Sequence, residues 1–292
     1  MSGSVPLIDR KEERARFKKI LAEQSARLVT IKDKPGNGKS RLLQEFHTAC
    51  GWEKIPSSLT VVSIGEIRTP FDLVGRIIGA FGSGPFQRFR ALDKERVNKN
   101  FDAFTSPVAG SVHVGGSIGG TAVVAQQIGV VAQEGAHVHM GPKEWSDEHE
   151  RIAAAECVDL FFEELHELAL DKPVVILLDE FEGCSVDTVR DWIVNDLLPD
   201  HVFNDEHESK LIVVIAGRDV PDLRERLGAR HDELVDVIPR LSRWCRDDIV
   251  EFLTAVTGRE PEPEEVDIIE MWLEKRDATI EVIVNTVTAW PG

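Results

Sequence analysis

Four short apolar runs along the chain have the composition of β-strands. They lie at 27–32, 59–64, 173–178 and 211–216. The last two, PVVILL and LIVVIA, are apolar throughout, which is typical of strands buried on both faces of a sheet. Helical patterns separate the runs. Buried strands that alternate with helices predict an α/β fold with a parallel sheet covered by helices on both faces.

Apolar residues recur at helical spacing in the segments between these runs. Helices are predicted over 10–25, 40–47, 70–81 and 147–170, and another begins near 186. After Pro221 the strand pattern fades and short helical patterns follow, around 247–257 and 264–275. The chain is therefore predicted to have a sheet-bearing domain over 1–220 and a small C-terminal helical domain over 221–292.

A glycine-rich insertion, about 105–143, fits neither pattern. Between 107 and 142 it contains eight glycines and a single charged residue, and the tetrapeptide VVAQ at 123–126 recurs at 130–133. Its composition favours a flexible linker. The repeat and the Val/His alternation instead favour a β-rich element that pairs between protomers through an open edge. Its histidines, His113, His137 and His139, have no acidic or cysteine partner nearby, so a metal site there is not predicted.

The segment DKPGNGKS at 33–40 follows one predicted strand and opens the next predicted helix. This is the structural context of a phosphate-binding P-loop. Glycines in the loop let backbone N–H groups turn toward a phosphate, and the helix N-terminus adds positive potential. Lys39 is expected to reach the β- and γ-phosphates, and the Ser40 hydroxyl to ligate magnesium. The candidate nucleotide-binding residues here are Pro35, Gly36, Asn37, Gly38, Lys39, Ser40 and Arg41.

One position departs from the GxxxxGK[ST] pattern, because Asp33 stands where the first glycine is expected. The competing interpretation is a glycine-rich left-handed turn followed by a lysine on an exposed helix.

Two adjacent carboxylates, Asp179 and Glu180, follow the apolar strand at 173–178. Ligands of open α/β sheets collect at the carboxyl ends of the strands, so this is where a Walker B pair belongs. Asp179 is expected to hold magnesium, and Glu180 to orient or deprotonate the attacking water. The alternative is a pair of solvated carboxylates that simply end a strand.

Arg218 follows the next strand, at 211–216, within the sequence AGRD. A guanidinium at this position can sense the γ-phosphate, because its planar fork suits phosphate oxygens. The alternative is an arginine that caps a loop or pairs with Asp219.

Acidic residues outnumber basic ones by 51 to 34, for a formal charge of -17. This balance disfavours a nucleic-acid partner, since phosphate backbones are repelled over most of the surface. The four cysteines show no CxxC pairing, which excludes a recognisable zinc or disulfide framework. No signal peptide or membrane-length apolar run is present. A cytoplasmic protein without a membrane partner is predicted.

With the P-loop, LLDEFEG and VIAGRDVP in this order, the chain resembles the STAND branch of AAA+-like P-loop NTPases, which includes bacterial NLR-like signalling ATPases. The segment PLIDRKEE at 6–13 is similar to that family's entry motif near the adenine, with Asp9 where glycine is usual. On this resemblance Asp9 and Arg10 are further nucleotide-binding candidates, and Glu13 is the motif's acidic residue. The segment also fits a helix N-terminus capped by Asp9.

The resemblance implies ATP/ADP and Mg2+ as cofactors, and a switch between a closed monomer and an open homo-oligomer that controls an effector. It also implies a helical lid over 221–292. The lid's usual Gly-x-Pro is missing, since the chain reads RDAT at 276–279, and no winged-helix or repeat sensor precedes Gly292. We therefore expect either an ATPase module from a longer protein or a sensor on another chain.

Two other functions fit the same motifs. A nucleotide-binding scaffold with negligible turnover is one, because Asp33 and the missing lid proline can spare binding while hydrolysis is lost. A DNA-transaction helper ATPase is the other, although it should show a basic stripe. The sequence does not select an arginine finger among Arg218, Arg230, Arg240 and Arg243.

Overall fold

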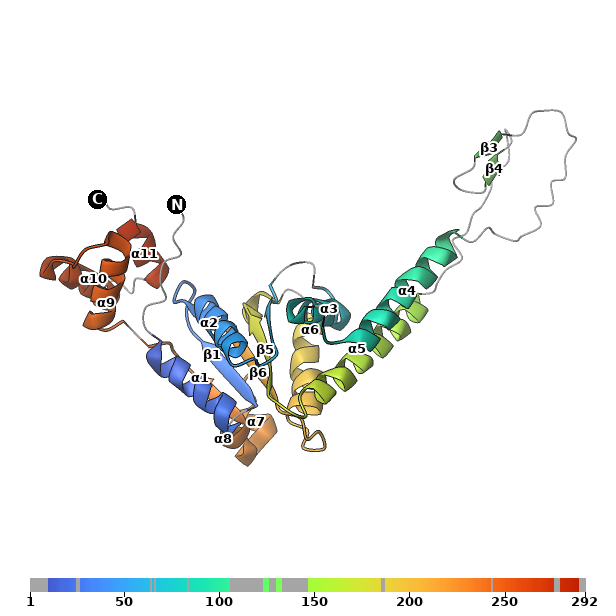
Figure 1. The fold of residues 1–292 in the computed structure, drawn as a ribbon, viewed down its shortest axis with the longest axis horizontal. Helices are drawn as coiled ribbons and strands as arrows, with labels where there is room; N and C mark the ends of the chain where they lie inside the picture. Colours follow the sequence, from blue (N-terminus) through green and yellow to red (C-terminus); the bar gives the residue numbers. More distant parts are fainter. Residues whose placement is uncertain are drawn as a thin grey trace, which may run out of the picture. The chain divides into compact units, whose positions relative to one another are not determined.

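The computed structural model describes residues 10–24, 27–63, 65, 67–82, 84–105, 123–125, 130–132, 147–184, 187–242, 244–275 and 279–288 (Figure 1). The chain divides into two compact units. Met1–Phe86 and Phe162–Gly292 make up the first, and Gln87–Phe161 the second.

The first unit is built on a five-stranded sheet in the order β2-β5-β6-β1-β7, and every neighbouring pair is parallel. The strands are β1 (Leu28–Lys32), β2 (Ser57–Val61), β5 (Val174–Asp179), β6 (Leu211–Gly217) and β7 (Val235–Ile238). All residues of β5 and β6 are buried, as their continuous apolar sequences require. Because the strands are parallel, all their carboxyl ends lie at one edge of the sheet.

One face of the sheet is covered by α1 (Lys11–Glu23) and α2 (Lys39–Trp52). Phe17 of α1 and Phe46 of α2 stack with their ring centroids 4.0 Å apart, and both belong to the same core as alternate residues of the strands. Because side chains alternate along a strand, the intervening residues face the other way. Ile176 and Ile215 are such residues, and both are fully buried.

The opposite face is covered by helices as well (Figure 1). These are α3 (Pro70–Phe81), α6 (Asp187–Trp192) and the π-helical segment η2 (Ile193–Val202). Sequence explains where α3 begins, since Thr69 and Asp72 form a capping box and Pro70 occupies the first turn. The predicted fold class, an α/β parallel sheet with helices on both faces, is confirmed.

The strand β7 corrects the prediction that only helices follow Pro221. It pairs with β1, with Leu28 opposite Val235, so the sheet extends past the predicted domain boundary at 220. Its sequence, VDVI, is short and has a polar residue inside it, because β7 is an edge strand that is only partly buried. An alternating pattern of four residues is too short to stand out. Short segments link β6 to β7: α7 (Arg224–Leu227), η3 (Gly228–Arg230) and α8 (His231–Leu234).

After β7 come the three helices α9 (Arg246–Thr257), α10 (Pro263–Lys275) and α11 (Ile280–Thr288). They share an apolar cluster of their own that includes Phe252, Ile269 and Ile283. This cluster is what the helical periodicity of the C-terminal part predicted, although it begins later than 221.

The second unit contains α4 (Gln87–Thr105), most of α5 (Asp147–Leu168), and the short strands β3 (Val123–Ala125) and β4 (Val130–Ala132). The two copies of the repeated Val-Val-Ala pair with each other as an antiparallel ribbon. The rest of the insertion at 107–142 lies outside the described residues, and its pairing between protomers stays a prediction. Among the helices of the described residues, none is both long and apolar enough to cross a lipid bilayer.

Candidate functional site

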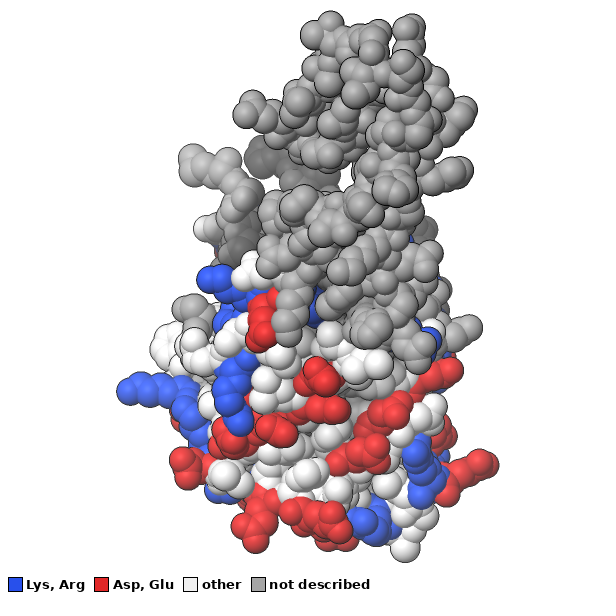
Figure 2. Space-filling model, turned by 90° about the vertical axis from the view of Figure 1, so that its right-hand side faces the viewer, with Lys and Arg blue, Asp and Glu red and all other residues white. Residues whose placement is uncertain are grey.

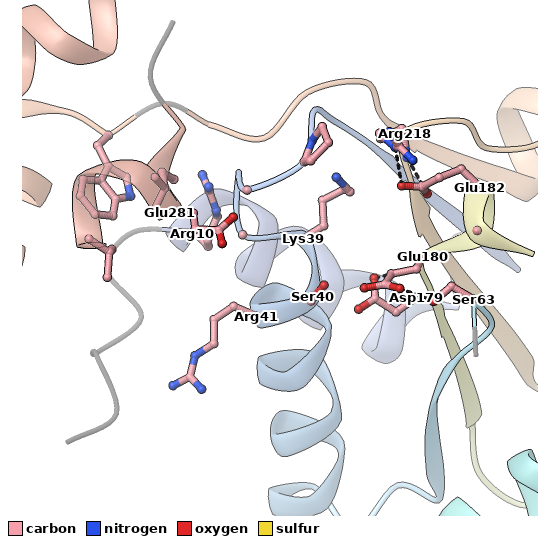
Figure 3. A pocket seen from close by; sticks show the side chains of 17 residues that line it. Arg10, Lys39, Ser40, Arg41, Ser63, Asp179, Glu180, Glu182, Arg218 and Glu281 are labelled. Atoms are coloured by element: carbon pink, nitrogen blue, oxygen red, sulfur yellow. Dashed lines mark hydrogen bonds and ion pairs between the residues drawn. The ribbon is translucent and has the colours of Figure 1, made fainter. Parts of the chain in front are cut away.

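An open cavity of ≈ 920 Å³ lies in the first unit, where the carboxyl ends of the strands meet the loop before α2 (Figure 3). Residues from the 35–41 segment line one side, and residues that follow β5 and β6 line the other. The cavity is the place where the parallel sheet brings together motifs that are far apart in sequence.

The loop between β1 and α2 turns through two glycines in the left-handed region, Gly36 at φ 75° and Gly38 at φ 88°. Gly38 is also the N-cap residue of α2. A Cβ atom on Gly36 would lie 2.8 Å from Oγ1 of Thr279, so only glycine fits there for steric reasons as well. The strand, the turn and the helix N-terminus together form a cradle in which backbone N–H groups can face an anion.

Lys39 lies at the centre of this cradle. It is buried, and its Nζ donates hydrogen bonds to the carbonyl oxygens of Asp33, at 2.7 Å, and Lys34, at 2.8 Å. Burial lowers the pKa of Lys39, while the carboxylates of Glu182, Asp33 and Asp179 oppose this shift. The ammonium is therefore held in place by its own loop.

Asp33 ties the loop to a distant segment. One carboxylate oxygen accepts hydrogen bonds from the backbone N–H of Lys34 and the side chain of Asn37, and the other accepts from the backbone N–H of Leu241. The departure from the glycine pattern therefore has a structural role. It joins the phosphate-loop candidate to the segment that leads from β7 toward α9.

Arg10 and Glu13, at the start of α1, hold the same segment. Arg10 is buried, and its guanidinium donates to the carbonyl oxygens of Asn37, at 2.8 Å, and Ser242. Glu13 is also buried and accepts a hydrogen bond of 2.7 Å from the backbone N–H of Ser242. The described part of the predicted entry motif, Arg10 to Glu13, thus contacts the loop through Arg10 and the C-terminal segment through both residues.

Asp179 ends β5 inside the cavity. Burial raises the pKa of its carboxyl, while hydrogen bonds from the Ser40 side chain and the Glu180 backbone N–H oppose the rise. The Ser40 hydroxyl and the Asp179 carboxylate are therefore neighbours, and their oxygens are of the kind that could hold one magnesium ion.

Glu180 has a left-handed backbone at φ 56°, which is uncommon for a residue other than glycine. Its side chain accepts a hydrogen bond from the hydroxyl of Ser63, which lies just after β2 (Figure 3). Gly183 permits the approach, because a Cβ atom there would lie 2.5 Å from Cβ of Ser63.

One interpretation of the sequence paired Arg218 with Asp219. The structure does not show this pair. The backbone N–H and the Nε of Arg218 both donate to the Glu182 carboxylate, at 2.8 and 2.9 Å, while Asp219 pairs with Arg190. Burial opposes ionisation of Glu182, but the hydrogen bonds from Arg218 and the charge of Lys39 prevail and lower its pKa. The Arg218 guanidinium is largely exposed and faces the cavity.

The cavity has an apolar wall formed by Trp244, Ile280 and Val284, and Glu281 lies beside them. The backbone N–H of Glu281 donates to the carbonyl oxygen of Gly36 at 3.0 Å, so the start of α11 contacts the loop directly. An apolar wall next to a polar cradle can take a ligand with a flat aromatic part and an anionic part.

Most of the candidate residues meet in this cavity. Those that line it are Arg10, Pro35, Gly36, Gly38, Lys39, Ser40, Arg41, Asp179, Glu180 and Arg218. Asn37 is the exception, because its side chain turns away to Asp33. Asp9 lies outside the described residues, as does Arg243. Arg230 pairs with Asp205, away from the cavity.

Sequence reasoning missed six of the cavity side chains described above: Ser63, Glu182, Trp244, Ile280, Glu281 and Val284. Two of them carried a signal. Ser63 lies near the end of the second predicted strand, so it belongs to the same edge of the sheet as Asp179, and Glu182 lies three residues beyond Asp179 in LLDEFEG. Of the other four, Trp244 precedes α9, and Ile280, Glu281 and Val284 belong to α11. The approach of this C-terminal part to the loop has no local signature.

The strand, glycine turn and helix around Lys39, set in a parallel sheet, decide the fold. It is an α/β P-loop NTPase fold. No family model matches the chain, and no curated protein matches it.

Solved structures similar to this chain include a Cdc6p and an ORC2 protein. Cdc6p from Pyrobaculum aerophilum is 15% identical, with a TM-score of 0.44, over 93% of this chain and 56% of that one. The ORC2 protein from Aeropyrum pernix, solved as ADPNP-ADP complexes, is 11% identical, with a TM-score of 0.41, over 99% of this chain and 70% of that one. The chain thus spans little more than half the length of the Cdc6p chain.

Proposed function

We propose that the chain binds ATP with magnesium in this cavity and hydrolyses it as the driving step of a molecular switch. The observation that carries the proposal is the convergence of Lys39, Ser40 and Asp179, from two motifs 140 positions apart, on one cavity beside a glycine turn. A lysine, a hydroxyl and a carboxylate in this arrangement are the groups that a magnesium-bound triphosphate needs.

The phosphates are assigned to the loop and to the N-terminus of α2. Lys39 exchanges its two loop carbonyls for the β- and γ-phosphates, and Ser40 and Asp179 hold the magnesium, Asp179 through a water molecule. The base is assigned to the apolar wall. Trp244 lines the cavity beside Ile280, and together they offer an apolar surface against which the flat base can pack.

For hydrolysis, Glu180 orients or deprotonates the attacking water, and Arg218 stabilises the charge on the γ-phosphate. Both side chains are engaged elsewhere here, Glu180 by Ser63 and Arg218 by Glu182. Catalysis therefore requires both to be released. The same observation favours a second candidate function, a nucleotide-binding scaffold with negligible turnover, in which they stay engaged.

The switch is supported by the contacts of Leu241 and Ser242 with Asp33, Arg10 and Glu13. These contacts connect the loop that would hold the phosphates to the segment leading into α9–α11. Arg10 also contacts the loop itself, at Asn37. A change in the loop on nucleotide binding would therefore be transmitted to the helical part, which would assemble the chain into a homo-oligomer or release an effector, as the resemblance to STAND proteins implies.

Surface charge supports a protein partner over a nucleic acid. Figure 2 shows acidic side chains spread across the described part of one face, with basic side chains interspersed among them. Such a surface repels a phosphate backbone.

The test is ATP and ADP binding by calorimetry with magnesium, for the wild type, Lys39→Ala and the control Lys19→Ala. Lys19 is an exposed lysine on α1, paired only with Glu23 among the described contacts. Removal of Lys39 is expected to weaken ATP binding by at least about tenfold, since a charged hydrogen bond contributes about 1.5–3 kcal/mol. If wild type and Lys39→Ala both fail to bind, the proposal is wrong.

Turnover separates the two candidate functions. Phosphate release by the wild type that falls at least about 100-fold in Glu180→Gln, with ATP binding retained, supports the ATPase. Binding without release by the wild type supports the scaffold. Size-exclusion chromatography with ATP and with ADP then tests the switch, which predicts a larger species with ATP.

A further inference from the structure

Three histidines that are distant in sequence meet in the first unit, away from the cavity. His166 lies near the end of α5, His201 on η2, and His207 in the loop between η2 and β6. One ring nitrogen of each lies within 4.8 Å of the others, and Nε2 of His166 is 3.2 Å from Nδ1 of His201. All three side chains are partly buried.

The cluster lies at the edge of the sheet opposite the cavity. His207 precedes β6 by only a few residues, and the backbone of Lys210 donates to Ala169 and accepts from Val174, the first residue of β5. The histidines therefore gather at the amino ends of β5 and β6, whereas Asp179 and Arg218 lie at the carboxyl ends of the same strands. The cluster has no part in the proposed nucleotide site.

We propose that His166, His201 and His207 bind a divalent transition-metal ion of the zinc class. Imidazole nitrogen is a preferred ligand of zinc, at a distance of about 2.0–2.1 Å. Two such bonds at a tetrahedral angle separate the nitrogens by about 3.3 Å. The observed 3.2 Å between His166 and His201 matches that separation, and a ring nitrogen of His207 lies within 4.8 Å of theirs.

Hydrogen bonds and ring stacking from neighbouring residues orient the histidine rings, as is usual for metal ligands. Nδ1 of His166 is 2.9 Å from the Ser209 hydroxyl, which fixes the ring and leaves Nε2 for the metal. The His201 ring stacks on Phe162 with centroids 3.4 Å apart, and the His207 ring stacks on His166 with centroids 3.9 Å apart. These contacts hold His166 and His201 in place. His207 has to turn out of its stack on His166 to bind, because a metal ion lies in the plane of each imidazole ring that ligates it.

The protonation state also suits a metal. Burial, together with the neighbouring His207 and His201, lowers the pKa of His166 to about 4. Burial and His207 likewise lower the pKa of His201 to about 4. Both imidazoles are therefore neutral at neutral pH, and a metal ion does not have to displace a proton from either.

Bound metal would act on the structure around it. It would join α5, η2 and the loop before β6, three elements held together here by ring stacking and hydrogen bonds. Three protein ligands leave a fourth position for water or another small ligand. Metal binding is expected to raise the unfolding temperature of the whole protein, since a ligand that binds only the native state stabilises it.

The test uses the full chain without a histidine tag, stripped of metal by a chelator and kept in excess magnesium and free of nucleotide. Zinc is titrated against a chromogenic chelator, and cobalt is added separately to obtain the visible absorption of a tetrahedral nitrogen site. We expect about one zinc ion per chain, bound more than about 100-fold more weakly by His207→Gln, because loss of a ligand costs more than loss of a supporting hydrogen bond. His166→Gln is expected to show the same loss.

Two control variants complete the design. His47→Gln changes a partly buried histidine that bonds only to Ser57 among the described contacts, and should bind zinc like the wild type. A variant with His113, His137 and His139 changed to asparagine should do the same. The folding of each variant is verified by circular dichroism. The proposal is overturned if His207→Gln and His166→Gln both bind zinc with the affinity of the wild type. Loss of binding in the triple variant alone would overturn it too, and would assign the metal to the glycine-rich insertion.

Discussion

The Asp33 carboxylate accepts a hydrogen bond of 3.0 Å from the backbone N–H of Leu241, a residue 208 positions further along the chain. In a P-loop pattern the position of Asp33 is expected to be glycine. A glycine would leave the backbone at the start of the loop free to adopt many conformations. The aspartate side chain instead binds this part of the loop to the segment beyond β7.

We expect Asp33→Ala to lower the free energy of unfolding by about 2 kcal/mol, because three hydrogen bonds are lost and the Leu241 N–H is left without its acceptor. The measurement is urea unfolding followed by circular dichroism. Asp219→Ala serves as the control, since Asp219 is exposed and pairs only with Arg190 among the described contacts, so its loss should cost less than about 1 kcal/mol. Equal effects of the two substitutions would contradict the structural role of Asp33.

We expect that Gly217 cannot be replaced without loss of stability, because a larger side chain would clash with its neighbours. A Cβ atom there would lie 2.6 Å from Oε2 of Glu182 and 2.9 Å from the carbonyl oxygen of Asp219. Gly217→Ala should therefore displace Glu182 from Arg218 and reduce stability by about 1–3 kcal/mol.

The matched control for Gly217 is Gly75→Ala. Gly75 lies within α3 and has nothing within 4 Å of its missing Cβ, so alanine should be neutral there or stabilise the protein by up to about 1 kcal/mol. Thermal unfolding of both variants makes the comparison. A stable Gly217→Ala protein with the Glu182–Arg218 pair intact would refute the steric argument.

The sequence was sufficient to predict the parallel sheet and the chemical groups at its edge because both depend on local patterns. Continuous apolar runs identify β5 and β6, and the residues just after them, Asp179 and Arg218, must then lie at the same edge. The glycine spacing before Lys39 has the same local character. Short edge strands such as β7 lack such a pattern.

Side-chain partners across the fold were not predictable in this way. Arg218 has Asp219 as its nearest acidic neighbour in sequence, yet it bonds to Glu182, because the turn after β5 brings that carboxylate to the end of β6. The contact of Glu281 with Gly36 depends on how α11 packs against the loop. Such contacts are set by tertiary packing, for which no short-range periodicity exists.

Asp179 is expected to destabilise the fold at neutral pH. Burial raises the pKa of its carboxyl above 3.8, the value for the unfolded chain. The folded state then binds more protons than the unfolded state over the pH range just above 3.8, so the contribution of Asp179 to stability falls as pH rises through that range. Without nucleotide and magnesium, Asp179→Asn should be more stable than the wild type at neutral pH.

This stability difference between Asp179→Asn and the wild type should shrink as the pH is lowered toward 3.8. Urea unfolding across that range measures it, with Asp219→Asn as an exposed control whose effect should stay small throughout. A variant less stable than the wild type at neutral pH would show that the hydrogen bonds from Ser40 and Glu180 outweigh burial.

Glu281 is expected to weaken nucleotide binding, if the proposed function holds. Its carboxylate lines the cavity, and its Oε2 lies 3.0 Å from where a Cβ atom of Gly36 would be, so it is close to the loop assigned to the phosphates. Glu281→Gln preserves the shape of the side chain and the backbone hydrogen bond to Gly36, and removes one negative charge. We expect ATP to bind about 3–10-fold more tightly to the variant, with a smaller gain at high salt.

Calorimetry with magnesium measures the change, and Glu274→Gln on α10 is the control, because Glu274 is exposed and does not line the cavity. Equal tightening in both variants would mean that only the net charge matters. Weaker binding by Glu281→Gln would reverse the argument. The carboxylate would then have to accept hydrogen bonds from the nucleotide, from a ribose hydroxyl or the amino group of the base, and these would outweigh its repulsion of the phosphates.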